Sequence, residues 1–169
     1  MVTVPAPERS SPLTGDASAY AEAVERLLPA PGERRGALLP LLHALQDAFG
    51  YIDDALVPHV AEALNLSRAD VHGVVTFYHD FRRAPAGRHV VRLCRAESCQ
   101  ARGGAAIERA AVDRLGVAMG ATSGDGRISL EPVYCLGLCA TGPNAMVDGV
   151  PLSRIDGPAL DRLVAQVSA

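Results

Sequence analysis

The sequence predicts an α+β protein in two parts, with a helical bundle in its N-terminal half and a small α/β unit after it. Two observations support this prediction. Apolar residues recur at helical spacing through residues 16–81, and from residue 89 short apolar runs alternate with helical segments and turn signals. The chain has 169 residues, of which 49% are hydrophobic, and this is enough for one packed domain or two small ones.

Four segments of the N-terminal half have an apolar face at helical spacing, and each has its own start or stop signal. Pro29 ends the first, and Gly50 is placed as the C-cap of the second. Two aspartates open the third, and Ser67 forms a capping-box pattern with Asp70 at the start of the fourth. The expected helices lie within residues 16–28, 36–50, 53–65 and 68–81.

The composition changes at residue 82, where the segment RRAPAGR is typical of a linker. A strand is expected over residues 89–94, a helix over 103–116, and a strand from residue 128 in which Pro132 indicates an edge position or a bulge. Asp148-Gly149 predicts a hairpin turn, and a last helix is expected over 156–167. The predicted domains are a flexible N-terminus (1–15), a helical domain (16–81) and an α/β domain (82–169).

Charge and composition exclude several function classes. The net charge of −3 does not indicate binding to nucleic acid. All 16 basic residues are arginine, so a Schiff-base lysine and a phosphate-loop lysine are both excluded. The sequence contains no pattern typical of a secretory signal and no apolar run long enough to span a membrane. We therefore expect a cytoplasmic bacterial protein that meets a membrane only through partner subunits.

The four cysteines lie in two short segments that each follow a predicted strand. Cys94 and Cys99 form a C-x4-C pair, and Cys135 and Cys139 form a C-x3-C pair. Four thiolates can hold a [2Fe–2S] cluster or a structural zinc, although zinc sites usually use C-x2-C pairs. Disulfides or thiol exchange are the third possibility, without the C-x-x-C of thioredoxin-type sites. Spacing alone leaves all three interpretations open.

The segments around these cysteines are similar to a known family. CRAESCQARGG and EPVYCLGLCATGPNAMVDG resemble the thioredoxin-like [2Fe–2S] ferredoxin family, which includes the small iron–sulfur subunit of respiratory complex I. RGALLPLLHALQDAFGYI and VAEALNLSRADVHGVVTFYHDF resemble the helical domain of that family. The resemblance covers about residues 30–150. It implies a thioredoxin-like α/β domain in which Cys94 and Cys99 hold one iron, and Cys135 and Cys139 the other.

Within the family, CRAESCQ and VVTFYHDF look most like the gamma subunit of NAD-dependent formate dehydrogenase. This resemblance implies a non-catalytic electron-transfer subunit that exchanges single electrons with a flavin in a partner. FMN, NAD and a molybdenum or tungsten cofactor are expected only in partner subunits, including a large catalytic subunit. The sequence itself has no G-x-G-x-x-G, phosphate-loop or G-x-S-x-G motif. The alternatives are the equivalent subunit of NADH:quinone oxidoreductase or NAD-linked hydrogenase and, from another class, a zinc-stabilised interaction module.

Three further features have competing interpretations. The aromatic and histidine residues near the end of the fourth helix are expected to pack in the core, with docking onto the flavin-bearing partner as the alternative. Arg95 and Arg102, beside the first cysteine pair, are candidates for raising the reduction potential of the cluster, with a solvated basic face as the alternative. The helix-turn-helix outline of the third and fourth helices is expected to be ordinary helix packing, because Arg68 is its only base-reading cation. The aromatic and histidine set comprises His72, Phe77, Tyr78, His79 and Phe81.

Overall fold

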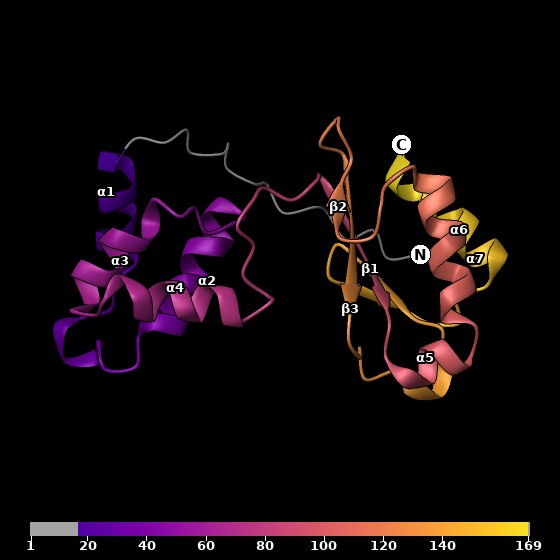
Figure 1. Ribbon diagram of the computed structural model, residues 1–169, viewed down its shortest axis with the longest axis horizontal. Helices are drawn as coiled ribbons and strands as arrows, with labels where there is room; N and C mark the ends of the chain where they lie inside the picture. Colours follow the sequence, from indigo (N-terminus) through magenta and orange to yellow (C-terminus); the bar gives the residue numbers. More distant parts are fainter. Residues whose placement is uncertain (1–16, 169) are drawn as a thin grey trace. The chain divides into compact units, whose positions relative to one another are not determined.

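The structure of the protein is a computed structural model that describes residues 17–168. The N-terminus, which the sequence predicts to be flexible (1–15), lies outside the described residues. The chain divides into two compact units between Pro85 and Ala86 (Figure 1), each with its own core. The predicted order, helices followed by an α/β part, is confirmed.

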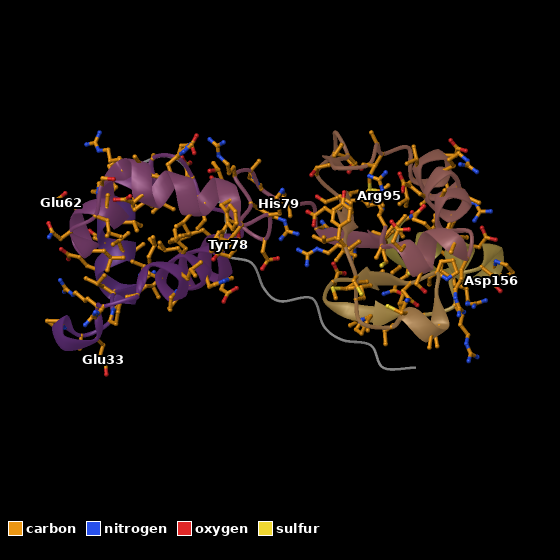
Figure 2. All side chains as sticks on the ribbon, turned by 60° about the horizontal axis from the view of Figure 1, so that its bottom comes forward. Glu33, Glu62, Tyr78, His79, Arg95 and Asp156 are labelled. Atoms are coloured by element: carbon orange, nitrogen blue, oxygen red, sulfur yellow. The ribbon has the colours of Figure 1, made fainter. Side chains whose placement is uncertain are left out.

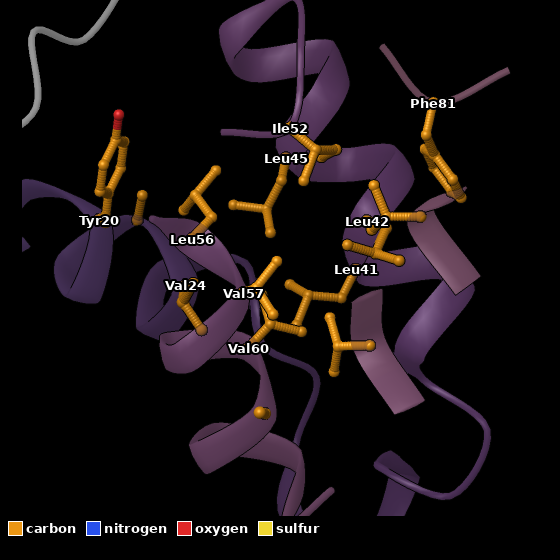
Figure 3. Close-up of a cluster of buried hydrophobic side chains, with 14 residues drawn as sticks. Tyr20, Val24, Leu41, Leu42, Leu45, Ile52, Leu56, Val57, Val60 and Phe81 are labelled. Atoms are coloured by element: carbon orange, nitrogen blue, oxygen red, sulfur yellow. The ribbon is translucent and has the colours of Figure 1, made fainter. Parts of the chain in front are cut away.

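The first unit consists of four α-helices around one apolar core (Figure 3). Its helices form because each has one apolar face, and those faces meet in the core. Leu41, Leu42, Leu45, Val60 and Val71 are among its fully buried side chains. The helices are α1 (Ala17–Leu27), α2 (Leu38–Phe49), α3 (Leu56–Leu64) and α4 (Arg68–Phe77), with a short 3₁₀ helix, η1 (Pro31–Glu33), after α1.

The predicted caps of this unit are present. Gly50 follows α2 with φ 81°, and its N–H donates to the carbonyl of Gln46. At the start of α4, the N–H of Asp70 donates to the hydroxyl of Ser67 at 3.1 Å. The N–H of Ser67 donates to the carboxylate of Asp70 at 3.2 Å, which completes the capping box.

Two predicted helix ends are wrong. α3 begins at Leu56, so the two aspartates precede it rather than occupying its first turn. Asp53 instead accepts hydrogen bonds from the N–H of Ala55 (2.9 Å) and the hydroxyl of Tyr20 (2.8 Å). α4 ends at Phe77, four residues earlier than predicted, because Tyr78 is extended.

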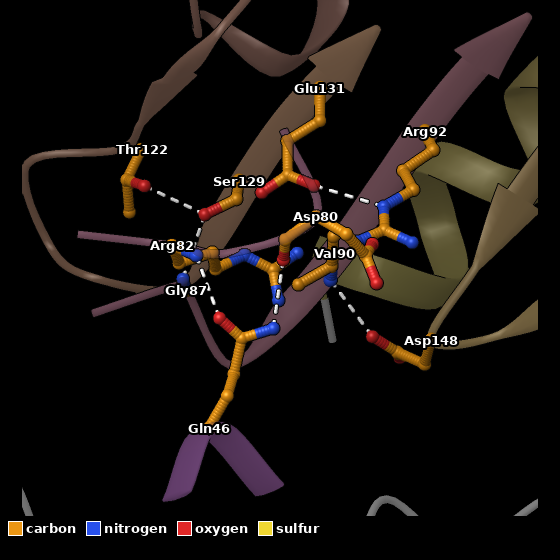
Figure 4. Close-up of polar contacts among 10 residues, drawn as sticks. All are labelled: Gln46, Asp80, Arg82, Gly87, Val90, Arg92, Thr122, Ser129, Glu131 and Asp148. Carbon is orange, nitrogen blue, oxygen red and sulfur yellow. Dashed lines mark hydrogen bonds and ion pairs between the residues drawn. The ribbon is translucent and has the colours of Figure 1, made fainter. Parts of the chain in front are cut away.

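The chain after α4 stays attached to the helical unit through Gln46 (Figure 4). The side-chain amide of Gln46 donates to the carbonyl of Asp80 at 2.8 Å and accepts from the N–H of Arg82 at 2.7 Å. Arg83 forms an ion pair with Asp54 at 2.6 Å. These contacts explain why the segment that looked like a linker continues in the helical unit as far as Pro85.

The second unit is a mixed five-stranded sheet with helices α6 and α7 packed side by side along it (Figure 1). The strand order is β2-β3-β1-β4-β5, and only the β1–β3 pairing is parallel. Val91, Leu130 and Ala145 from three strands meet Leu160 of α7 and Ala111 of α6 in its core. The elements are β1 (His89–Cys94), α5 (Glu97–Ala101), α6 (Gly104–Leu115), β2 (Ala121–Thr122), β3 (Ile128–Val133), η2 (Cys139–Thr141), β4 (Ala145–Val147), β5 (Val150–Leu152) and α7 (Gly157–Ser168).

Of the two local predictions for this unit, the hairpin turn at Asp148-Gly149 is confirmed, and the edge position of Pro132 is not. Asp148 and Gly149 join β4 to β5 with φ 51° and 86°, as a two-residue hairpin turn of this type requires. The edge position predicted for Pro132 is wrong for β3 as a whole, because β3 lies between β2 and β1. However, β2 pairs only with Ser129 and Leu130. Pro132 therefore lies beyond the end of β2, where its missing N–H costs no ladder bond.

No helix among the described residues is both long enough and apolar enough to cross a membrane.

Candidate metal centre

The four cysteines are gathered at one end of the sheet of the second unit. Cys94 is the last residue of β1, and it pairs in register with Val133, the last residue of β3. Parallel strands place the segments that follow them at the same edge of a sheet. The segment after β1 carries Cys99 in α5, and the segment after β3 carries Cys135 and Cys139. The sheet topology therefore brings together two pairs whose first cysteines are 41 residues apart in the chain.

The thiols come together as two pairs. The Sγ atoms of Cys135 and Cys139 lie 3.6 Å apart, and Cys94 and Cys99 lie close enough that each thiol shifts the pKa of the other. Two thiolates on one tetrahedral metal, each bound at about 2.3 Å, lie about 3.8 Å apart. The two pairs also influence each other electrostatically, because the charge of Cys94 contributes to raising the pKa of Cys139, and the charge of Cys139 contributes to raising the pKa of Cys99. All four cysteines are free thiols.

The two pairs differ in exposure to solvent. Cys94 and Cys99 are 5% and 1% exposed, whereas Cys135 and Cys139 lie on the surface. Among residues 17–168, no three His, Cys, Asp or Glu side chains converge as closely as the ligands of one metal ion.

Neighbouring backbone N–H groups affect the pKa of the Cys94 thiol. Burial raises its pKa, but hydrogen bonds from the N–H of Ala96, the Cys99 thiol and the N–H groups of Cys135 and Leu136 outweigh that effect. The pKa of Cys94 is therefore lowered from its ordinary value. Donors around sulfur stabilise the thiolate, which is the form that binds metal.

The pKa shifts of Cys99 and Cys139 have the opposite direction. Burial raises the pKa of Cys99, and its hydrogen bond with Cys94 adds to this, against a lowering by the N–H of Asn144. The hydrogen bond with Cys135 raises the pKa of Cys139. In each case a neighbouring thiol, once ionised, disfavours a second negative charge on the cysteine beside it. A bound cation would relieve this repulsion between two thiolates.

The segment that carries the second pair has an unusual backbone. Cys135 adopts φ 97°, which is rare for a residue with a side chain and costs on the order of 1–3 kcal/mol. Gly137 follows at φ 78°, as expected for the tight turn between the two cysteines, and its N–H donates to the Cys135 sulfur at 3.3 Å. At Gly142, an added Cβ would lie 3.3 Å from the Cys99 sulfur. The chain therefore passes this thiol at a distance that favours glycine.

Two cross-links between the cysteine segments could not be seen in the sequence. The hydroxyl of Ser98 donates to the carbonyl of Cys139 at 3.0 Å. The guanidinium of Arg102 donates to the carbonyl of Ala140 at 3.1 Å. Both donors belong to the segment of α5, a five-residue helix that the sequence did not predict. The position of α5 beside η2 depends on the sheet topology, so no local pattern in the sequence predicts it.

The residues singled out near the end of α4 differ in burial, although the ring of Tyr78 contacts the rings of both Phe77 and Phe81. Phe81 is 6% exposed, and its ring packs against that of His43 with the centroids 4.8 Å apart, so core packing is confirmed for it. Phe77 and Tyr78 are 73% and 43% exposed, so core packing is wrong for them. His72 and His79 are exposed as well, and Figure 2 shows Tyr78 and His79 on the helical unit.

The two arginines beside the first pair have different partners. Arg95 forms an ion pair with Glu108 of α6 at 3.1 Å, so a carboxylate offsets its charge. Arg102 reaches the carbonyl of Ala140 in the second cysteine segment instead. Figure 2 shows Arg95 on the α/β unit. The structure therefore makes Arg102 the stronger candidate for an electrostatic effect at the thiols.

The sequence of this chain matches the thioredoxin-like [2Fe-2S] ferredoxin family over residues 23–168. The chain belongs to this family. Membership implies one [2Fe–2S] cluster, so that prediction is confirmed at the level of the family. The family match does not itself say which residues are the ligands.

Individual relatives of the family agree with this assignment. The chain is 36% identical to a NADH-quinone oxidoreductase subunit of Escherichia coli K12 over 147 residues, which cover 87% of this chain and 89% of the relative. It is 32% identical to the HndA subunit of the NADP-reducing hydrogenase of Solidesulfovibrio fructosivorans, over 87% of this chain and 85% of that protein.

A solved structure shares the fold. The crystal structure of an NAD⁺-reducing [NiFe]-hydrogenase in the H₂-reduced state matches with a TM-score of 0.68 and 23% sequence identity. The match covers 78% of this chain and 22% of the hydrogenase chain. At this identity the likeness supports the fold alone.

Proposed function

We propose that Cys94, Cys99, Cys135 and Cys139 hold the [2Fe–2S] cluster of this family member, with one iron on each pair. The observation that supports this most is the meeting of two thiol pairs at one end of the sheet, one of them with its Sγ atoms 3.6 Å apart. The N–H of Gly137 donates to the Cys135 sulfur, and neighbouring N–H groups lower the pKa of Cys94. Both features suit a centre with negative charge. When bound, the cluster supplies a one-electron couple.

The protein's own residues then have a limited set of tasks. They bind the cluster, direct N–H donors at its ligands and bury one pair of thiols while leaving the other on the surface. A one-electron centre cannot transfer a hydride, so flavin and nicotinamide chemistry belongs to partner chains. We infer that the chain is an electron-transfer subunit of an NAD-linked oxidoreductase complex. The names of its relatives, a subunit of NADH-quinone oxidoreductase and one of NADP-reducing hydrogenase, support this inference.

The complex to which the subunit belongs is a finer proposal. The segments CRAESCQ and VVTFYHDF favour NAD-dependent formate dehydrogenase, with FMN, NAD and a molybdenum or tungsten cofactor in the partner subunits. The 36% identity to the Escherichia coli relative favours NADH:quinone oxidoreductase as the second candidate. Purification of the tagged chain with its native partners separates the two. Formate-dependent reduction of NAD⁺ by the purified complex supports the first, and NADH-dependent reduction of a quinone without formate activity supports the second.

The ligand assignment is tested by Cys135→Ser. We expect this variant to lose the cluster or bind it weakly, because a serine hydroxyl remains protonated and is a poor replacement for a thiolate. The helical unit should still fold, since its core contains no residue of the cysteine segments. Visible absorption and iron content measure the first effect, and far-UV circular dichroism measures the second.

Tyr134→Phe is the matched control, because Tyr134 is the exposed neighbour of Cys135 and offers no thiol. It should keep the parental cluster content. A Cys135→Ser protein with a full cluster spectrum would contradict the ligand assignment.

A further inference from the structure

Asn144 is one of two buried polar residues in the described chain, together with Ser129. It is 3% exposed and lies between η2 and β4. Its backbone carbonyl accepts the N–H of Cys94 at 3.0 Å, at the end of β1. This residue therefore lies where the two cysteine segments and the sheet meet.

The side-chain amide of Asn144 has two acceptors. Its Nδ2 donates to the carbonyl of Leu138 at 2.7 Å and to the Cys99 sulfur at 3.5 Å. The hydroxyl of Thr141 lies 3.4 Å from its Oδ1. A carbonyl and a sulfur on one side, and a hydroxyl on the other, fix the orientation of the amide.

These contacts connect a thiol of the first pair to the loop that carries the second. Leu138 is the residue before Cys139, so Nδ2 holds this loop against Cys99 with a single amide group. A buried amide that lost these partners would leave polar groups unsatisfied. Hydrogen bonds therefore constrain the backbone carbonyl, the Oδ1 atom and the Nδ2 group of Asn144.

We propose that Asn144 is a positioning residue of the cluster site that raises the reduction potential through its hydrogen bond to Cys99. This proposal rests on the proposed ligand set. Reduction adds one electron, drawn from the redox cofactor of a partner subunit, and increases the negative charge on the ligands. A neutral N–H donor to a ligand sulfur stabilises the more negative state, and hydrogen bonds to sulfur are among the factors that set such potentials.

Asn144→Ala and Asn144→Asp remove the side-chain donor in two ways, and both keep the backbone N–H of residue 144. Alanine lacks the amide, and an ionised carboxylate accepts but cannot donate. We expect a lower midpoint potential in both, with the reduction equilibrium of Asn144→Ala shifted about tenfold toward the oxidised state, or about 59 mV for one electron. An EPR-monitored redox titration at pH 8, with iron and sulfide content determined on the same samples, measures this.

Ser129→Ala is the matched control. Ser129 is 2% exposed and lies in the same unit, but its hydroxyl bonds the N–H of Gly87 and the Thr122 hydroxyl rather than a cysteine (Figure 4). It should keep the parental potential. A parental potential in Asn144→Ala, or an equal drop in Ser129→Ala, overturns the proposal.

A second measurement uses the unmodified protein, so it does not depend on a variant that folds. The chain contains two asparagines, Asn65 and Asn144. With ¹⁵N placed only in asparagine side-chain amides, pulsed EPR of the reduced cluster should show a ¹⁵N coupling, and Asn65→Asp should retain it. Absence of the coupling, or its loss in Asn65→Asp, refutes the role of Asn144. An error in the proposed ligand assignment would be detected separately, because the Cys135→Ser protein would then keep a full cluster.

Discussion

Each cysteine of the site has a different environment, although the sequence presents four equal thiols. Cys94 is buried among N–H donors that lower its pKa, whereas burial raises the pKa of its neighbour Cys99. Cys135 and Cys139 lie on the surface. The spacing of the cysteines was sufficient to predict these four residues as candidates. The donors from Ser98, Arg102 and Asn144 were not predictable in this way, because they depend on which loops the sheet brings together.

The charges of Arg95 and Arg102 are predicted to act differently on the cluster. Arg102→Gln should lower the midpoint potential, because it removes a positive charge that reaches the second cysteine segment. Arg95→Gln should lower it less, since Glu108 lies 3.1 Å from the guanidinium and already offsets its charge. Parallel redox titrations of the two variants compare them. A larger drop in Arg95→Gln would contradict this assignment.

Among the elements, the helices were the most predictable because their signals are local. The apolar faces of α1–α4 and the capping box of Ser67 and Asp70 are visible in the sequence. Element ends were less predictable. The predicted start of α3 was too early because Asp53 instead accepts a hydrogen bond from Tyr20, 33 residues away in the chain. Helix α5 was not predicted because its five residues are too few to show a periodic pattern.

The capping box of α4 should contribute measurably to the helical unit. Ser67→Ala should lower the free energy of unfolding by about 1 kcal/mol at pH 7, because the N–H of Asp70 loses its acceptor. Urea unfolding followed by circular dichroism measures the loss. Ser153→Ala, at an exposed serine of the other unit, should leave the same transition unchanged.

The effect of the Ser67 hydroxyl should also depend on pH. Hydrogen bonds from the Ser67 side chain and backbone lower the pKa of Asp70. A carboxyl with a lowered pKa stabilises the folded state above its ordinary pKa, and this contribution is lost as the pH falls through the lowered value. The difference between wild type and Ser67→Ala should therefore shrink below about pH 4. A difference that grew on acidification would contradict the capping box.

At the scale of the whole molecule, the chain consists of two units with separate cores. The sequence predicted both parts from a change in periodicity and composition. The sequence placed the boundary between the two parts at residue 82, because arginine, proline and glycine there are typical of a linker. In the structure, however, the side chain of Gln46 holds Arg82 to the helical unit. We propose that the two units are independently stable domains.

This proposal predicts that core damage stays within one unit. Leu42→Ala, at a fully buried residue of the helical core, should destabilise that unit by about 2–5 kcal/mol and leave the cluster spectrum unchanged. Leu160→Ala, equally buried in the second core, should weaken cluster retention instead. Hydrogen exchange and visible absorption report on the two units separately. Loss of the cluster in Leu42→Ala would contradict independent domains.

The most direct test of the central claim is the metal and sulfide content of the purified protein, combined with EPR. A [2Fe–2S] cluster predicts two irons and two acid-labile sulfides per chain, a brown colour, and an EPR signal that develops on one-electron reduction. A zinc-stabilised interaction module predicts one zinc, no sulfide and no colour. The first result is expected from the two thiol pairs and the family of the chain, and the second would contradict the assignment of a cluster.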